Sequence, residues 1–212
     1  MEFNASQVWG CAVAADRING GYVKEPVWDY EQTPAVVKTD ANKLMVKQWL
    51  RTGNFSLVTA ADIATGEEIR NFFNGYTLKA LTGNISDFDK QALRIAQMDV
   101  FTGKNMLEFA IVSCLPSAAR RERDRNELKR EIYHSDQLPG AEGDAVLGDL
   151  EVVSCSYSQM YNKFKITGRM GESIVDFWFN KALDRATTLR IKGKIKAQRG
   201  NNTTQLNYVK KV

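Results

Sequence analysis

Residues 151–212 alternate apolar and polar side chains with a period of two, and this pattern constrains the fold more than any other feature. It is clearest over Thr188–Gln198, where four cations alternate with apolar residues. The apolar set is Leu189, Ile191, Ile195 and Ala197, and the cationic set is Arg190, Lys192, Lys194 and Lys196. Successive side chains of a β-strand point to opposite faces of a sheet. The pattern therefore predicts a strand with one buried face and one exposed, cationic face.

Turn-forming residues divide this region into five predicted strands. They are Glu151–Ser158, Asn162–Arg169, Ser173–Asn180, Thr188–Gln198 and Thr203–Lys211. Lys181–Ala186, between the third and fourth, is long enough for about one and a half helical turns. The predicted order is β-β-β-α-β-β.

Residues 1–136 predict a mainly helical region with some strand. The expected helices are Ala5–Asp16, one capped by Asp40 and ended by Gly53, one beginning at the capping-box spacing of Thr65, and one capped by Ser86. A hairpin is predicted over Asp99–Val112, where two apolar runs flank a glycine turn. A charged helix is then expected to begin at Pro116 and Ser117. The chain as a whole is predicted to be α+β.

The charged helix has two interpretations. Arg121, Arg125 and Lys129 are four residues apart and would share one helical face, which suits contact with phosphates. Acidic residues are interleaved with them, so the face would instead be solvated and held by internal ion pairs. The pairs expected in that case are Arg120–Asp124 and Arg123–Glu127.

Charge is distributed unevenly along the chain. The net charge is +4, but residues 151–212 contain twelve basic and four acidic residues, which leaves a net −4 for residues 1–150. Residues 137–149 are rich in glycine and proline, with several acidic residues, and predict a linker or a long acidic loop. We therefore expect a helical, net acidic domain over 1–136 and a basic β domain over 150–212. A basic domain of this kind indicates a polyanionic partner.

Several classes of protein are not expected. No apolar run approaches the ~18 residues that cross a bilayer, and residues 1–4 lack the features of a secretory signal, so we expect no membrane partner and a cytoplasmic location. Three dispersed cysteines and a single histidine do not match the ligand spacing of a zinc site. No cofactor is expected.

The sequence does not favour an enzyme. Phosphate-binding loops, dinucleotide-binding glycine motifs and nucleophile elbows are all lacking. His134, Ser135 and Asp136 are adjacent, whereas the members of a catalytic triad converge from separate elements. Two acidic pairs, Glu67 with Glu68 and Asp87 with Asp89, leave a metal-dependent nuclease as an alternative.

An outward-facing tryptophan among cationic strands favours single-stranded nucleic acid as the partner. In the third predicted strand Val175, Phe177 and Phe179 share the core face, which places Trp178 outside. Aromatic rings stack on bases while Lys and Arg follow the phosphates. The residues predicted to bind are Tyr161, Lys163, Lys165, Arg169, Trp178, Arg190, Lys192, Lys194, Lys196 and Arg199.

Two alternatives remain for these residues. Another element of the protein would cover Trp178 if it is structural, and the row of cations on Thr188–Gln198 would protect an edge strand from aggregation. A barrel that binds an acidic protein would have the same charge. RNA is an alternative to DNA, because no aromatic RNA-binding motif identifies the sugar.

The strand order resembles an OB-fold, a small barrel that often binds oligonucleotides, so we expect a five-stranded, OB-like antiparallel β-barrel after the helical region. Thr187–Lys196 and Gln205–Lys210, in about the last quarter of the chain, resemble the closing strands of phage-encoded single-stranded DNA-binding proteins. That resemblance implies a phage accessory factor for replication or transcription, acting in the host cytoplasm, that holds melted DNA and recruits a phage polymerase. The sequence departs from the family at Tyr208–Val212, where many members have an acidic tail that binds partner proteins. A polymerase would therefore contact the acidic N-terminal part.

Overall fold

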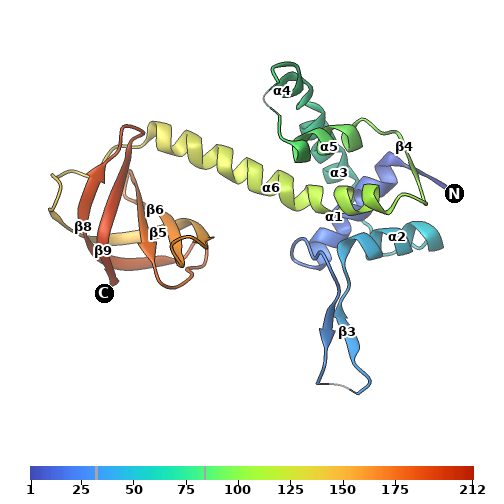
Figure 1. Ribbon diagram of the computed structural model, residues 1–212, viewed down its shortest axis with the longest axis horizontal. Helices are drawn as coiled ribbons and strands as arrows, with labels where there is room; N and C mark the ends of the chain where they lie inside the picture. Colours follow the sequence, from blue (N-terminus) through green and yellow to red (C-terminus); the bar gives the residue numbers. More distant parts are fainter. Residues whose placement is uncertain (32, 84) are drawn as a thin grey trace. The chain divides into compact units, whose positions relative to one another are not determined.

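The computed structural model describes residues 1–31, 33–83 and 85–212 (Figure 1). The chain forms two compact units, Met1–Arg123 and Asp124–Val212, which we call the helical unit and the barrel unit. Helix α6 (Met106–His134) begins in the first unit and ends in the second. The architecture is α+β, as the sequence predicts.

The helical unit consists of the strands and helices that precede α6, together with the first part of α6. In chain order they are β1 (Glu2–Asn4), α1 (Ala5–Ile18), β2 (Val27–Asp29), β3 (Val36–Thr39), α2 (Asn42–Thr52), α3 (Ala60–Asn74), α4 (Thr77–Leu81), α5 (Asp87–Ala96) and β4 (Val100–Thr102). Strand β1 pairs with β4 and β2 pairs with β3, both antiparallel. No helix in the described ranges is both long and apolar enough to span a bilayer.

Helix α1 lies in the core of this unit and packs against α2 and α3. Its contact with α3 depends on two glycines. A Cβ at Gly66 would lie 2.9 Å from the carbonyl carbon of Trp9 and 3.0 Å from the nitrogen of Gly10. The two backbones therefore approach more closely than any side chain at position 66 permits.

Two predicted helices begin elsewhere, and the predicted hairpin is wrong. Helix α3 begins at Ala60, because Thr59 and Asp62 form the capping box in place of Thr65. Ala41, and not Asp40, is the N-cap of α2. Over 99–112, Val100–Thr102 pairs with β1 and Met106 already begins α6. The predicted Gly53 stop and Ser86 cap are confirmed.

Helix α6 also differs from the charged helix that was predicted. Pro116 lies inside it instead of starting it. Its expected internal pairs are replaced by longer-range ones: Arg120 binds Asp16 at 2.9 Å and Asp124 binds Arg185. The guanidinium of Arg123 lies 5.8 Å from the ring centroid of Phe72. A periodic run of alternating charges does not reveal such partners, because they come from other elements.

The barrel unit contains five strands closed in the order β5-β6-β7-β9-β8. They are β5 (Ala145–Ser158), β6 (Lys163–Met170), β7 (Ser173–Phe179), β8 (Thr188–Gln198) and β9 (Thr203–Lys211). Pairing of β7 with β9 is parallel and the other pairs are antiparallel, so the barrel is mixed and not wholly antiparallel. Lys181–Ala186 is a loop with a bend at Lys181 and a turn at Arg185 and Ala186, in place of the predicted helical turn. This closed five-stranded barrel is compatible with an OB-like fold.

The alternating residues fill the barrel as predicted. Ile166, Val175, Phe177, Ile191 and Ile195 are buried inside it. The segment before β5 is held to the barrel by hydrogen bonds: Leu138 N donates to Thr204 Oγ1, and Gln198 donates to the carbonyls of Leu138 and Gly140.

The end of α6 contributes acidic partners to the barrel unit. Glu131 binds Arg169 at 2.9 Å, and Asp124 pairs with Arg185. With these helical residues included, residues 124–212 contain fifteen basic and eleven acidic residues, while residues 1–123 contain fourteen of each. The net positive charge of the chain therefore lies in the barrel unit.

Candidate nucleic-acid interface

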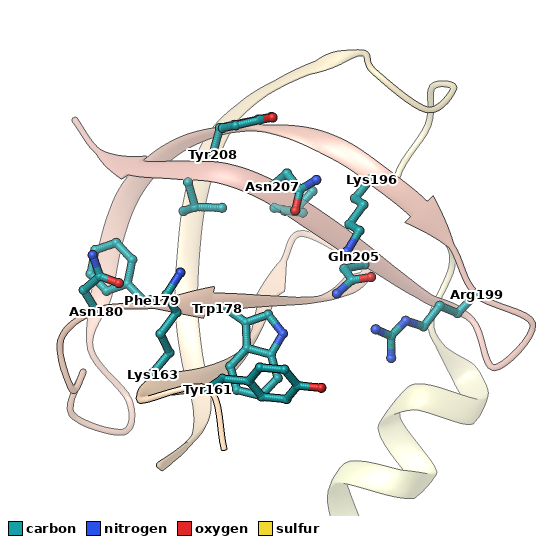
Figure 2. Close-up of a pocket in the computed structure, with 12 residues that line it drawn as sticks. Tyr161, Lys163, Trp178, Phe179, Asn180, Lys196, Arg199, Gln205, Asn207 and Tyr208 are labelled. Carbon is teal, nitrogen blue, oxygen red and sulfur yellow. The ribbon is translucent and has the colours of Figure 1, made fainter. Parts of the chain in front are cut away.

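A groove of about 870 Å³ crosses the outside of the barrel (Figure 2). Residues from several elements line it. They are Tyr161 from the β5–β6 turn, Lys163 from β6, Trp178 and Phe179 from β7, Asn180 after β7, Lys196 from β8, Arg199 after β8, and Gln205, Leu206, Asn207, Tyr208 and Val209 from β9. Five of the ten residues predicted to bind come together here: Tyr161, Lys163, Trp178, Lys196 and Arg199.

An aromatic pair forms one wall of the groove. The ring centroids of Tyr161 and Trp178 are 4.8 Å apart, with an interplanar angle of 51°. Tyr161 is 58% exposed and Trp178 is partly buried. Figure 2 shows the two rings together, with Arg199 and Lys163 on opposite sides of them. Trp178 is therefore contacted by a neighbouring tyrosine of its own unit and still borders the groove.

The register of β6 and β7 explains why this tryptophan faces outward. Lys165 is opposite Trp178, and Ile166 is opposite Phe177. Residues opposite each other in a β-ladder lie on the same face, so Trp178 shares the outer face with Lys165 while Phe177 enters the core. The same alternation places Lys163 outside.

The cations that line the groove, and Lys165 beside it, differ in their ion-pair partners. Lys163 and Lys196 are exposed and form no ion pair within the described part of the chain. Arg199 lies 3.5 Å from Asp176, and Lys165 lies 3.7 Å from the same carboxylate oxygen. The first two are therefore available to an anionic ligand, whereas the second two are partly neutralised.

Asp176 is an acidic residue beneath this face. It is 4% exposed, and its Oδ1 atom has no hydrogen-bond partner among the described residues. Taking a carboxylate out of water is costly unless cations compensate it. Lys165 and Arg199 provide that compensation.

The other five predicted residues lie outside the groove. Arg169 is held by Glu131 and Glu151, each at 2.9 Å, and these partners, Glu131 first, raise the pKa of its guanidinium. Lys192 and Lys194 line a second hollow of about 390 Å³ on the same barrel. Lys165 and Arg190 line neither hollow.

The alternation of apolar and polar residues in the sequence did not predict that β9 lines the groove. Gln205, Asn207 and Tyr208 line the groove, yet their uncharged side chains gave no signal of their own. The order of strands in the closed barrel shows why β9 lines the groove, because β9 lies between β7 and β8. A strand between the tryptophan strand and the lysine strand necessarily contributes to the surface that they share.

The acidic pairs considered for metal binding have structural surroundings. Glu67 lies within α3, 3.9 Å from Arg70, and Asp87 in the first turn of α5 pairs with Lys90 at 3.0 Å. Across residues 1–31, 33–83 and 85–212, no group of three His, Cys, Asp or Glu side chains is placed to hold a metal ion.

Comparisons with known proteins found no relative. No family model matches the sequence, and no curated protein and no solved structure is significantly similar to it.

Proposed function

We propose that the barrel unit binds single-stranded DNA in the groove without chemical change to it. The observation that carries the proposal is the Tyr161–Trp178 pair, bordered by Lys163 and Lys196, which have no acidic partner among the described residues. Stacking on an aromatic face contributes about 1–3 kcal/mol per base and tolerates any sequence. Lysines beside it neutralise phosphates, so affinity falls as the salt concentration rises.

The position of the groove on the barrel supports this proposal. OB-folds bind oligonucleotides on the face of the second and third strands, between the first hairpin loop and the loop joining the last two strands. Here these strands are β6 and β7, Tyr161 lies in the first hairpin turn and Arg199 follows β8. The same arrangement favours unpaired bases, because a base in a duplex does not offer its face to an aromatic ring.

The resemblance of the closing strands to phage proteins extends the proposal. We infer an accessory factor of phage replication or transcription that keeps melted DNA single-stranded and contacts a phage polymerase. The helical unit, which is net neutral, is the part left for that protein contact.

The test is fluorescence anisotropy of labelled single-stranded DNA, double-stranded DNA and RNA at two salt concentrations. We expect salt-sensitive binding that is tightest for single-stranded DNA. Trp178→Ala should weaken it about 5- to 150-fold, the range that corresponds to one lost stack, with little change in salt dependence. Trp28→Ala is the matched control, because Trp28 is 46% exposed in the helical unit.

Each other outcome rejects the proposal in a different way. Failure to bind any nucleic acid at low salt, with heparin or an acidic protein bound instead, would assign the barrel to an acidic protein partner. Degradation of DNA that depends on Mg²⁺ would indicate a nuclease. Equal weakening by Trp178→Ala and Trp28→Ala would place the binding site elsewhere.

A further inference from the structure

The second hollow adjoins the groove through a single aromatic residue. Lys192, Lys194, Lys210 and Leu147 are among the residues that line it, and Tyr208 lines both it and the groove. Tyr208 is 79% exposed, and Figure 2 shows it on β9 at the edge of the groove away from Trp178. Its ring therefore lies where a ligand would leave the groove for the second hollow.

The backbone at Tyr208 is held in an unusual conformation. Its φ of 53° lies in the left-handed region, which a bulky residue rarely adopts. The register between β8 and β9 shifts at this point: Lys192 is opposite Lys210 and Lys194 is opposite Asn207. Bulges of this kind redirect a side chain, and strained residues of this kind concentrate at ligand sites.

Gly193 permits the close approach of the two strands at the bulge. A Cβ at this position would lie 3.0 Å from the carbonyl oxygen of Asn207 and 3.2 Å from Cγ2 of Val209. A larger residue would push β9 away and change the direction of Tyr208. The glycine between two lysines of β8 thus leaves room for the bulge, whose extra residue lies on β9.

The second hollow gathers three lysines that no acidic side chain of the described residues pairs with. Lys192, Lys194 and Lys210 are exposed and form no ion pair in the described residues. Lys192 and Lys210 are directly opposite across the strands, an arrangement that is unfavourable without an anion. Leu147, 61% exposed, adds an apolar side chain to the same hollow.

We propose that a single strand continues from the groove across Tyr208 into the second hollow, where one further base stacks on Tyr208 and phosphates bind Lys192, Lys194 and Lys210. This inference rests on the proposed function and adds a second subsite on β5, β8 and β9. A short oligonucleotide fills the groove alone, and a longer one fills both.

The test compares oligothymidylates of roughly four and twelve nucleotides, which span the lower part of the range of site sizes for one OB-fold. For the longer one, Lys192→Ala/Lys194→Ala/Lys210→Ala should reduce the slope of log affinity against log salt by about 2, from three phosphate contacts of about 0.7 each. The short oligonucleotide should bind this variant and the wild type within about twofold. A triple variant of exposed lysines in the helical unit, Lys24→Ala/Lys38→Ala/Lys104→Ala, matches the change in net charge.

Tyr208 is tested by Tyr208→Asn, because asparagine tolerates the left-handed conformation and the change removes only the ring. We expect about tenfold weaker binding of the longer oligonucleotide, and Tyr208→Phe should retain wild-type affinity. Equal loss in both lysine triple variants, or a salt slope unchanged by the barrel variant, would overturn the second subsite while leaving the groove intact. Absence of binding by the wild type to either length would instead reject the proposed function itself.

Discussion

The two units use the same kinds of residue in opposite ways. The helical unit buries several large aromatic side chains, with Trp9, Phe73, Phe101 and Phe109 at most 1% exposed, although Trp28 and Tyr30 of the same unit are exposed. In the barrel unit Tyr161 and Tyr208 are exposed, and Trp178 lies at the border of a groove. An aromatic residue in the sequence therefore indicates a binding surface only if its ring is not part of the hydrophobic core.

Cations show the same contrast. In the helical unit Arg17, Arg94 and Arg120 each bind a buried carboxylate, at 2.8, 3.2 and 2.9 Å. On the barrel, Lys163, Lys192, Lys194 and Lys196 have no acidic partner within the described residues. Arginines tied to buried acids stabilise a fold, whereas lysines without partners remain available to a ligand. Mutations in the two units should therefore affect different properties.

The largest expected effect is on the stability of the helical unit. Gly66→Ala would place a methyl group within 3.0 Å of the backbone of α1, and overpacking of this kind costs about 1–3 kcal/mol or more. We expect a lower thermal midpoint, measured by circular dichroism at the helical band, with unchanged affinity for single-stranded DNA. Gly200→Ala is the control, because nothing lies within 4 Å of the Cβ position there. Loss of DNA affinity in Gly66→Ala at a temperature where it stays folded would contradict the division of roles.

A second effect on stability follows from pH. The Arg17 hydrogen bond, with those of Thr59, lowers the pKa of Asp62 from 3.8 to about 2. Because the folded protein binds this proton less readily, the stabilisation is complete above about pH 5 and is lost as the pH falls through 4 towards 2. We expect this to contribute about 2 kcal/mol to acid destabilisation, and Asp62→Asn to abolish that contribution. Denaturant melts at pH 6 and pH 3 capture about half of it, about 1 kcal/mol, because the folded carboxyl is still ionised at pH 3. Asp87→Asn is the exposed control, and equal pH dependence in wild type and Asp62→Asn would refute the prediction.

In the barrel unit an acidic residue should limit binding instead of supporting the fold. Asp176→Asn removes the charge that lies 3.7 Å from Lys165 and 3.5 Å from Arg199. With both cations released, we expect single-stranded DNA to bind about three- to tenfold more tightly and with a steeper salt dependence. Glu142→Gln, an exposed acid outside the groove, should have little effect. Weaker binding by Asp176→Asn would show that Asp176 is needed to position Arg199.

Local periodicity predicted the barrel strands well. The predicted bounds of Thr188–Gln198 and Thr203–Lys211 match β8 and β9, because each strand has one buried and one exposed face. Strand β5 begins six residues before the predicted Glu151. Gly148 and Asp149 continue the glycine-rich, acidic composition of the preceding residues, which is typical of a loop. Its pairing with β8 over Ala145–Glu151 supplies the hydrogen bonds that overcome this composition.

Contacts between distant residues could not be predicted in the same way. The sequence placed Arg169 on the outer face but did not reveal Glu131, which comes from α6 and neutralises it. The helical unit was harder still. Thr59 and Asp62 have the same local capping-box spacing as Thr65 and Glu68, so spacing alone did not choose between the two starts of α3. Continuation of α6 through Pro116 goes against the local signal of a proline. The pattern of residues predicts where a strand lies and which side chains face outward. The ion-pair partners of those side chains can be known only from the folded structure.

The smallest expected effect distinguishes two cations of the same strand. Lys196 lines the groove, whereas Arg190, on the same outward face of β8, lines neither hollow. Lys196→Ala should lower the salt slope by about 0.7, the value for one phosphate contact on a single strand, because a counterion is no longer displaced there. Arg190→Ala should leave that slope unchanged within error. The measurement is the affinity of a short oligothymidylate at four or more salt concentrations, since a single concentration does not separate a lost contact from a change in net charge. Equal slopes in the two variants would mean that the whole cationic face of β8 attracts DNA without a defined path for the phosphates. The groove would then not be the site that positions the phosphates.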